Sequence, residues 1–210
     1  VGRPRAYAVA LLLFGLSGFV LNSGSHVVAR ERSYFGAMSV HDDIRGGRAV
    51  WTLVHGSTVH GFQSQDGAER LNPTGYYHRG GAYGDLFRHL FAEGNGPRRV
   101  GVIGLGTGGL GCYGRSQDIF DFYEIDPIVL EIAQNVDWFT YLRDCPPRKY
   151  LRVGDARLTM ETAADGIYDL IILDAFSSDA IPVHLVTVEA LKLYQRKLKS
   201  NGIIAYHISN

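Results

Sequence analysis

Two hydrophobic patterns divide the chain. Between residues 34 and 63, short apolar and β-branched runs are separated by turn signals such as HDDIRGG, which predicts a small antiparallel sheet of β-hairpins. After Pro97, apolar strand-like runs alternate with segments of helical periodicity. This alternation is typical of a parallel sheet with helices on both faces. The pattern therefore predicts a small β domain followed by an α/β domain.

The α/β part contains several buried-type strands separated by amphipathic helices. We expect strands at residues 98–104, 119–125, 149–154, 168–174 and 202–208. We expect helices at about residues 82–93, 108–115, 127–136, 156–164 and 187–199. The final helix has a basic last turn followed by Asn201-Gly202, which is a typical helix stop.

The first thirty residues differ from the rest of the chain. Residues 6–21 form an apolar run that follows Arg3 and Arg5, and a membrane-spanning helix needs about 20 such residues. We expect a signal-peptide core, a signal anchor or the last helix of a membrane domain, and a buried core helix is the alternative. The predicted domains are 1–30 (hydrophobic, transmembrane), 31–66 (antiparallel β) and 67–210 (α/β).

Composition removes some classes of function. Lys+Arg and Asp+Glu are each 21, so no net positive charge favours a nucleic-acid partner. The two cysteines, Cys112 and Cys145, have no metal-ligand spacing and no framework of pairs, which favours a reducing compartment. The histidines lack the spacing of a zinc site, and we predict no metal. Of these histidines, His184 has the best claim to line a pocket.

The glycine-rich stretch GLGTGG, residues 104–109, follows the first strand of the α/β part. Glycines at a strand-to-helix turn allow the backbone to approach a ligand closely. Glu124 ends the next strand about twenty residues later, where a carboxylate can accept both hydroxyls of a ribose. Together these features indicate a nucleoside, of either the nicotinamide dinucleotide or the S-adenosylmethionine type.

Two further acids end the following strands. Asp155 comes after the third strand, where it can accept from an adenine amino group or cap the next helix. Asp174 ends the fourth strand, beside the point where ligands of open α/β sheets bind. Asp179 follows in a serine-rich loop, either as part of a site or as a solvated turn residue.

The order and spacing of several motifs resemble the spermidine synthase (polyamine aminopropyltransferase) family, particularly its bacterial membrane-associated branch. The motifs are GLGTGGL, YEIDP, GDAR, YDLIILDAFSSDAIPVHLVT and LKSNGIIAYHISN, of which DAFSSDAIPVHL is the most specific. The resemblance implies a Rossmann-like fold of the class I methyltransferase type after a small β domain. Such folds usually have further strands after the one that ends here, so we expect the domain to be incomplete at its C-terminal end.

The resemblance also implies the ligands and the residues that bind them. The co-substrate would be decarboxylated S-adenosylmethionine, and the acceptor would be an amine. The nucleoside would be bound by Gln63, Gly104, Gly106, Gly108, Glu124, Asp155 and Ala156. Asp174 would be the catalytic carboxylate, and Tyr76 or Tyr77 would bind the acceptor. Asp179 or Asp85 could supply a second carboxylate.

One departure from the family pattern bears on the acceptor. The region LNPTGYYHRGGAYGDLF lacks the acidic pair and the glutamate that polyamine-making members carry around the tyrosine, which weakens putrescine as the substrate. Aminopropyl transfer is the main prediction. The alternatives are S-adenosylmethionine-dependent methyl transfer and an inactive nucleoside-binding domain of a membrane transporter. We expect membrane association with the catalytic domain facing the cytoplasm, and a homodimer is left open.

Overall fold

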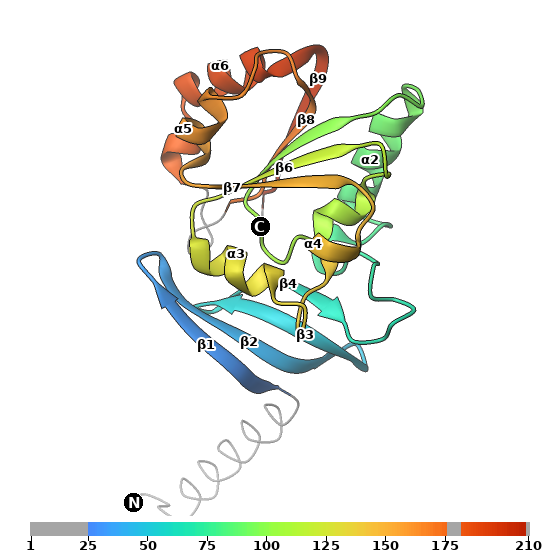
Figure 1. The fold of residues 1–210 in the computed structure, drawn as a ribbon, viewed down its shortest axis with the longest axis vertical. Coiled ribbons are helices and arrows are strands. Elements are labelled where there is room, and N and C mark those ends of the chain that lie inside the picture. The colour runs from blue at the N-terminus through green and yellow to red at the C-terminus, as the bar shows by residue number, and fades with distance from the viewer. Residues whose placement is uncertain (1–24, 176–181, 209–210) are drawn as a thin grey trace, which may run out of the picture.

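The structure is a computed structural model of the 210-residue chain, and it describes residues 25–175 and 182–208 (Figure 1). Two sheets make up its framework. The antiparallel sheet is near the N-terminus, and the parallel sheet is covered by helices. The predicted α/β, Rossmann-like class with a preceding β domain is confirmed.

The N-terminal sheet has the order β1-β2-β3-β4, joined by antiparallel hairpins. Its strands are β1 (His26–Ser33), β2 (Gly36–Arg45), β3 (Arg48–His55) and β4 (Thr58–Ser64). Strand β1 was not predicted, and the predicted domain boundary after residue 30 falls inside it. Its sequence, HVVARERS, is largely exposed, so it lacks the apolar alternation that identified the next strands.

The parallel sheet has the order β7-β6-β5-β8-β9. Its strands are β5 (Arg99–Ile103), β6 (Ile119–Glu124), β7 (Arg148–Val153), β8 (Tyr168–Leu173) and β9 (Leu198–Tyr206). Every residue of β8 is buried, as expected for a central strand covered on both faces. Chain order reverses between β5 and β8, which makes this pair the topological switch point.

Helices cover both faces of the parallel sheet (Figure 1). The helical elements are η1 (Gly75–Tyr77), α2 (Ala82–Ala92), η2 (Gly109–Tyr113), α3 (Pro127–Gln134), α4 (Tyr141–Asp144), α5 (Ala156–Glu161), η3 (Val183–Leu185) and α6 (Val188–Lys197). Apolar side chains of α2 and α3 join one buried cluster, while those of α5 and α6 join another. The predicted helix at 108–115 is the short 3-10 turn η2.

The N-terminal sheet packs against α3. Met38 and Leu53 on the sheet share a buried cluster with Ile132 of α3 and with Phe139 just after it. This contact turns one face of the small sheet toward the carboxyl ends of the parallel strands (Figure 1). The small sheet therefore helps to enclose the region where nucleosides bind in such folds.

The prediction of membrane association is corrected. Within residues 25–175 and 182–208, no helix is long and apolar enough to cross a membrane. The apolar run at residues 6–21, on which the prediction depended, lies outside the described residues.

Cys112 of η2 and Cys145 after α4 form a disulfide, with 4.8 Å between their Cα atoms. This differs from the expectation of unpaired cysteines in a reducing compartment. The two residues are 33 positions apart in the chain, and packing of α4 against η2 brings them together. A single pair of cysteines at this spacing has no sequence signature, so the disulfide was not predicted.

Candidate active site

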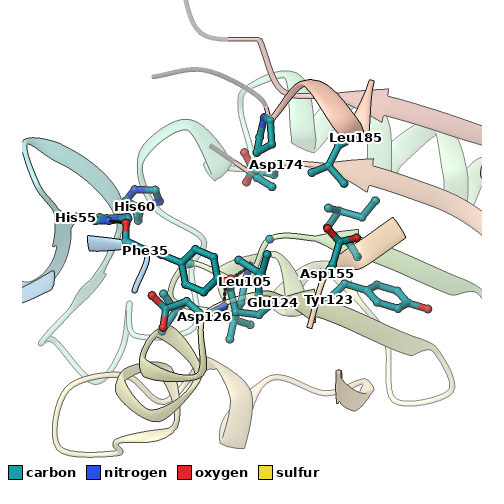
Figure 2. A pocket seen from close by; sticks show the side chains of 18 of the residues that line it. Phe35, His55, His60, Leu105, Tyr123, Glu124, Asp126, Asp155, Asp174 and Leu185 are labelled. Carbon is teal, nitrogen blue, oxygen red and sulfur yellow. Dashed lines mark hydrogen bonds between the residues drawn. The ribbon is translucent and has the colours of Figure 1, made fainter. Parts of the chain in front are cut away.

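A cavity of about 510 Å³ lies at the carboxyl ends of β5, β6 and β8. The N-terminal sheet supplies its other wall, through Met38, Leu53, His55 and His60. In Figure 2, Asp174 and Glu124 lie on opposite sides of the cavity, with the two histidines toward one end and Asp155 toward the other. The cavity is therefore at the topological switch point, where ligands bind in open α/β sheets.

The glycine-rich loop forms part of the cavity wall, and two of its glycines have little room for a side chain. A Cβ on Gly104 would lie 2.5 Å from the carbonyl oxygen of Asp174, and the φ angle of this glycine is +98°. A Cβ on Gly106 would lie 2.6 Å from the carbonyl oxygen of His60, at a φ of +52°. Both glycines line the cavity, so the loop presents bare backbone to a ligand.

Glu124 lies at the end of β6 beside this loop. One carboxylate oxygen accepts from the backbone N–H of Leu105 at 2.9 Å, and the other accepts from that of Asp126 at 3.0 Å. Burial raises the pKa of Glu124 above its ordinary value of 4.5, although these two donors act against the rise. The backbone bonds hold the side chain in place and leave each oxygen a lone pair for a ligand hydroxyl.

Asp155 caps a helix and also reaches the cavity. One oxygen caps α5 by accepting from Leu158 N at 3.1 Å, and the other lies 2.9 Å from Nε2 of His184. Asp155, Ala156 and His184 all line the cavity. The residues after β7 and those of η3 therefore meet across this end of the cavity, where the adenine was expected.

Asp174 follows β8 and is nearly buried, with 2% of its side chain exposed. The hydroxyl of Tyr77 donates to one carboxylate oxygen, and Nδ1 of His207 lies 2.5 Å from the other. Burial raises the pKa of the Tyr77 phenol well above its ordinary value, and the charge of Asp174 adds to this effect. Tyr77 is therefore a neutral donor at any physiological pH.

Two predicted nucleoside-binding residues do not line the cavity. The Gln63 side chain is fully buried, and its amide bonds to the backbone N–H and hydroxyl of Thr140 and to the carbonyl of Arg70. We interpret Gln63 as a tie between β4 and the segment before α4. Gly108 is the residue just before η2 and is not among the lining residues. Asp179, which was predicted to bind the substrate, lies outside the described residues.

The structure also adds residues that the sequence reasoning did not assign to the site. Among the histidines the sequence singled out only His184, but His207 contacts Asp174 and His60 lines the cavity. Strand register is the signal that would have found His207. Tyr206 pairs with Leu173, so the residues that follow them lie side by side.

The cavity has an acidic character. The carboxylates of Glu124, Asp126, Asp155 and Asp174 line it, and its lining includes no Lys or Arg among the described residues. Such a site favours a cationic ligand over an anionic one. In the described part of the chain, no group of His, Cys, Asp and Glu is arranged to hold a metal ion. The absence of a metal stays a prediction.

Comparison with known proteins gives relatives of two kinds. A polyamine aminopropyltransferase from Vibrio vulnificus is 37% identical over 117 residues, covering 51% of this chain and 36% of that protein. The crystal structure of a probable spermidine synthase from Corynebacterium glutamicum superposes with a TM-score of 0.69 at 17% identity, covering 86% of this chain and 63% of that one. The chain is therefore similar in sequence to a polyamine aminopropyltransferase and similar in fold to a spermidine synthase. No model of a known protein family matches it.

A second kind of relative is named for a different activity. A putative O-methyltransferase from Mycobacterium bovis is 28% identical over 177 residues, covering 80% of this chain and 75% of that protein. The match to the aminopropyltransferase spans only about a third of that protein's length. Membership of the membrane-associated branch has no support from these relatives.

Proposed function

We propose that the chain transfers an aminopropyl group from decarboxylated S-adenosylmethionine to an amine. The observation that carries this proposal is the meeting of Glu124, Asp155 and Asp174 at one cavity beside bare glycine backbone. This arrangement suits an adenosyl ligand with a positive sulfonium. The sequence similarity to a polyamine aminopropyltransferase supports the same activity.

The ligand parts can be assigned to the lining residues by their chemistry. The ribose hydroxyls would donate to the carboxylate of Glu124, which already accepts two backbone N–H bonds. The adenine would lie near Asp155 and Ala156, and the aminopropyl-sulfonium chain would follow the backbone of Gly104 and Gly106. The acids around the cavity would stabilise the sulfonium charge.

The reaction replaces a carbon–sulfur bond with a carbon–nitrogen bond. The lone pair of the amine attacks the methylene carbon beside the sulfonium, the C–S electrons leave on sulfur, and methylthioadenosine departs as a neutral thioether. The new ammonium then loses a proton to solvent. Asp174 would accept a hydrogen bond from the amine and stabilise the positive charge that develops on nitrogen. Because Tyr77 and His207 stabilise its carboxylate, we assign it an orienting and electrostatic role.

The lining also favours the decarboxylated co-substrate. S-adenosylmethionine carries an α-carboxylate, which needs a cation or backbone N–H donors when it is removed from water. The described lining offers carboxylates and no Lys or Arg, and the serine-rich segment at residues 176–181 contains none in its sequence. A carboxylate on the ligand would therefore be repelled at this site.

Methyl transfer is a second candidate because the O-methyltransferase relative matches more of its own length. One mass-spectrometric experiment separates the two candidates. The chain is incubated with a panel of mono-, di- and aromatic amines and with either decarboxylated or carboxylated S-adenosylmethionine. We expect methylthioadenosine and an amine heavier by one aminopropyl group. S-adenosylhomocysteine and a methylated amine would instead support methyl transfer, and no product from either would refute both.

A further inference from the structure

The carboxylate of Asp174 is held on both of its oxygens by two residues that are far apart in the sequence. Tyr77 of η1 donates to Oδ2, while Nδ1 of His207 contacts Oδ1 at 2.5 Å. An ionised carboxylate only accepts hydrogen bonds, so Nδ1 of His207 must carry the proton. This arrangement leaves the carboxylate little freedom to rotate.

The backbone places His207 for this contact. Tyr206 of β9 pairs in parallel with Leu173 of β8, and the N–H of His207 donates to the Leu173 carbonyl at 2.9 Å. The imidazole is largely buried, with 19% of its side chain exposed. Its position therefore depends on the sheet rather than on a flexible loop.

A second connection joins His207 to the cavity wall. The ring of Tyr76 stacks on the His207 imidazole with 4.2 Å between ring centroids, and Tyr76 lines the cavity. The Tyr76 hydroxyl donates to that of Tyr77 at 3.0 Å, and Tyr77 donates to Asp174. Asp174, Tyr77, Tyr76 and His207 therefore each contact two others of this group of four. Tyr83 of α2 packs edge-on against the imidazole, at 6.2 Å between centroids.

We propose that His207 is a positioning residue for the transfer, one that holds Asp174 in the orientation that receives the acceptor amine. The proposal rests on the proposed function. His207 does not line the cavity, so it acts through Asp174 and not by touching the substrate. Without His207, Oδ1 of the nearly buried Asp174 loses its hydrogen-bond donor. The carboxylate is then held by Tyr77 alone and is freer to rotate about its Cβ–Cγ bond. Small misplacements of a catalytic group reduce turnover strongly.

Two variants separate the hydrogen bond from the ring stack. His207→Phe keeps an aromatic ring against Tyr76 but removes the donor. His207→Asn places an amide N–H near the position of Nδ1 but removes the ring. His89→Phe is the matched control, because His89 is an exposed residue of α2.

We expect His207→Phe to lower kcat by about 10- to 100-fold, with nucleoside affinity within about twofold of the parent. His207→Asn should keep kcat within about threefold, because it keeps the donor. The role is overturned if His207→Phe retains its kcat, or if both variants lose kcat equally. A parent enzyme that transfers to no amine overturns this role together with the proposed function, whereas an active parent with an unaffected His207→Phe overturns the role alone.

Nuclear magnetic resonance gives a readout that does not depend on the folding of His207→Phe. In the parent chain, the Nδ1–H proton of His207 should exchange slowly and resonate downfield because it lies in a short bond to a carboxylate. The signal should move upfield or vanish in Asp174→Asn. A parent spectrum with His207 protonated at Nε2 alone would contradict the assignment.

Discussion

The glycine-rich loop offers a sharp test, because the structure contains a matched pair of glycines. Gly106 has a φ of +52°, and a Cβ there would lie 2.6 Å from the backbone oxygen of His60. Gly46, in the β2–β3 turn, has a φ of +56° and nothing within 4 Å of an added Cβ. Gly46→Ala therefore measures the backbone strain alone, and Gly106→Ala measures the same strain plus a collision.

The magnitudes follow from these two terms. The left-handed backbone costs alanine roughly 1–2 kcal/mol at either position. The collision at Gly106 is with backbone, so the loop or β4 must move, which adds roughly 1–3 kcal/mol. For a chain of this size, each kcal/mol lowers the melting temperature by about 2–4 °C. Gly46→Ala should therefore melt roughly 2–8 °C below the parent, and Gly106→Ala should melt lower still.

The functional part of the prediction is measured by calorimetric titration with methylthioadenosine. Movement of the loop should weaken binding by Gly106→Ala at least about tenfold, which corresponds to about 1.4 kcal/mol. Gly46 is not among the residues that line the cavity, so Gly46→Ala should bind like the parent. An unchanged affinity in Gly106→Ala would refute the claim that this backbone lies against the ligand. Equal melting temperatures for the two variants would refute the collision.

Three other changes test separate parts of the account. Asp174→Asn should lower kcat at least about 100-fold while nucleoside affinity stays within about threefold, as measured by steady-state kinetics and calorimetry. Asp169→Asn, at the opposite end of β8 and paired with Arg98, should keep its kcat per folded molecule. Because the pKa of Glu124 is raised, its ionised fraction falls earlier than that of an ordinary glutamate as the pH drops, so nucleoside affinity measured by pH-dependent titration should weaken between neutral pH and 4.5. Affinity that is constant over that range would contradict the ribose assignment. Cys145→Ser removes a disulfide that joins residues 33 positions apart, so thermal unfolding should show a free energy of unfolding lower by about 4 kcal/mol. An unchanged melting temperature would contradict the disulfide.

The sequence was sufficient for the parts of the fold that depend on local pattern. β8 reads as a continuous apolar run because both of its faces are covered, and this made its identity as a parallel strand clear. The acids at the strand ends could be placed together for the same reason, since parallel strands bring their carboxyl ends to one edge. The glycine-rich loop and Glu124 meet at that edge.

The features that the sequence did not predict depend on tertiary contacts. β9 begins at Leu198, before the glycine that was read as a helix stop, because pairing with β8 outweighs the local signal. The partner of Gln63 is Thr140, which is 77 positions away. The contact of His207 with Asp174 requires the register of β8 against β9, which a single sequence does not contain.

Calorimetry of the parent chain can show whether the acidic cavity binds an adenosyl sulfonium that lacks an α-carboxylate. We predict that decarboxylated S-adenosylmethionine binds at least about tenfold more tightly than S-adenosylmethionine, a difference of about 1.4 kcal/mol. Equal or tighter binding of the carboxylated form would mean that the cavity is not selective for the decarboxylated co-substrate.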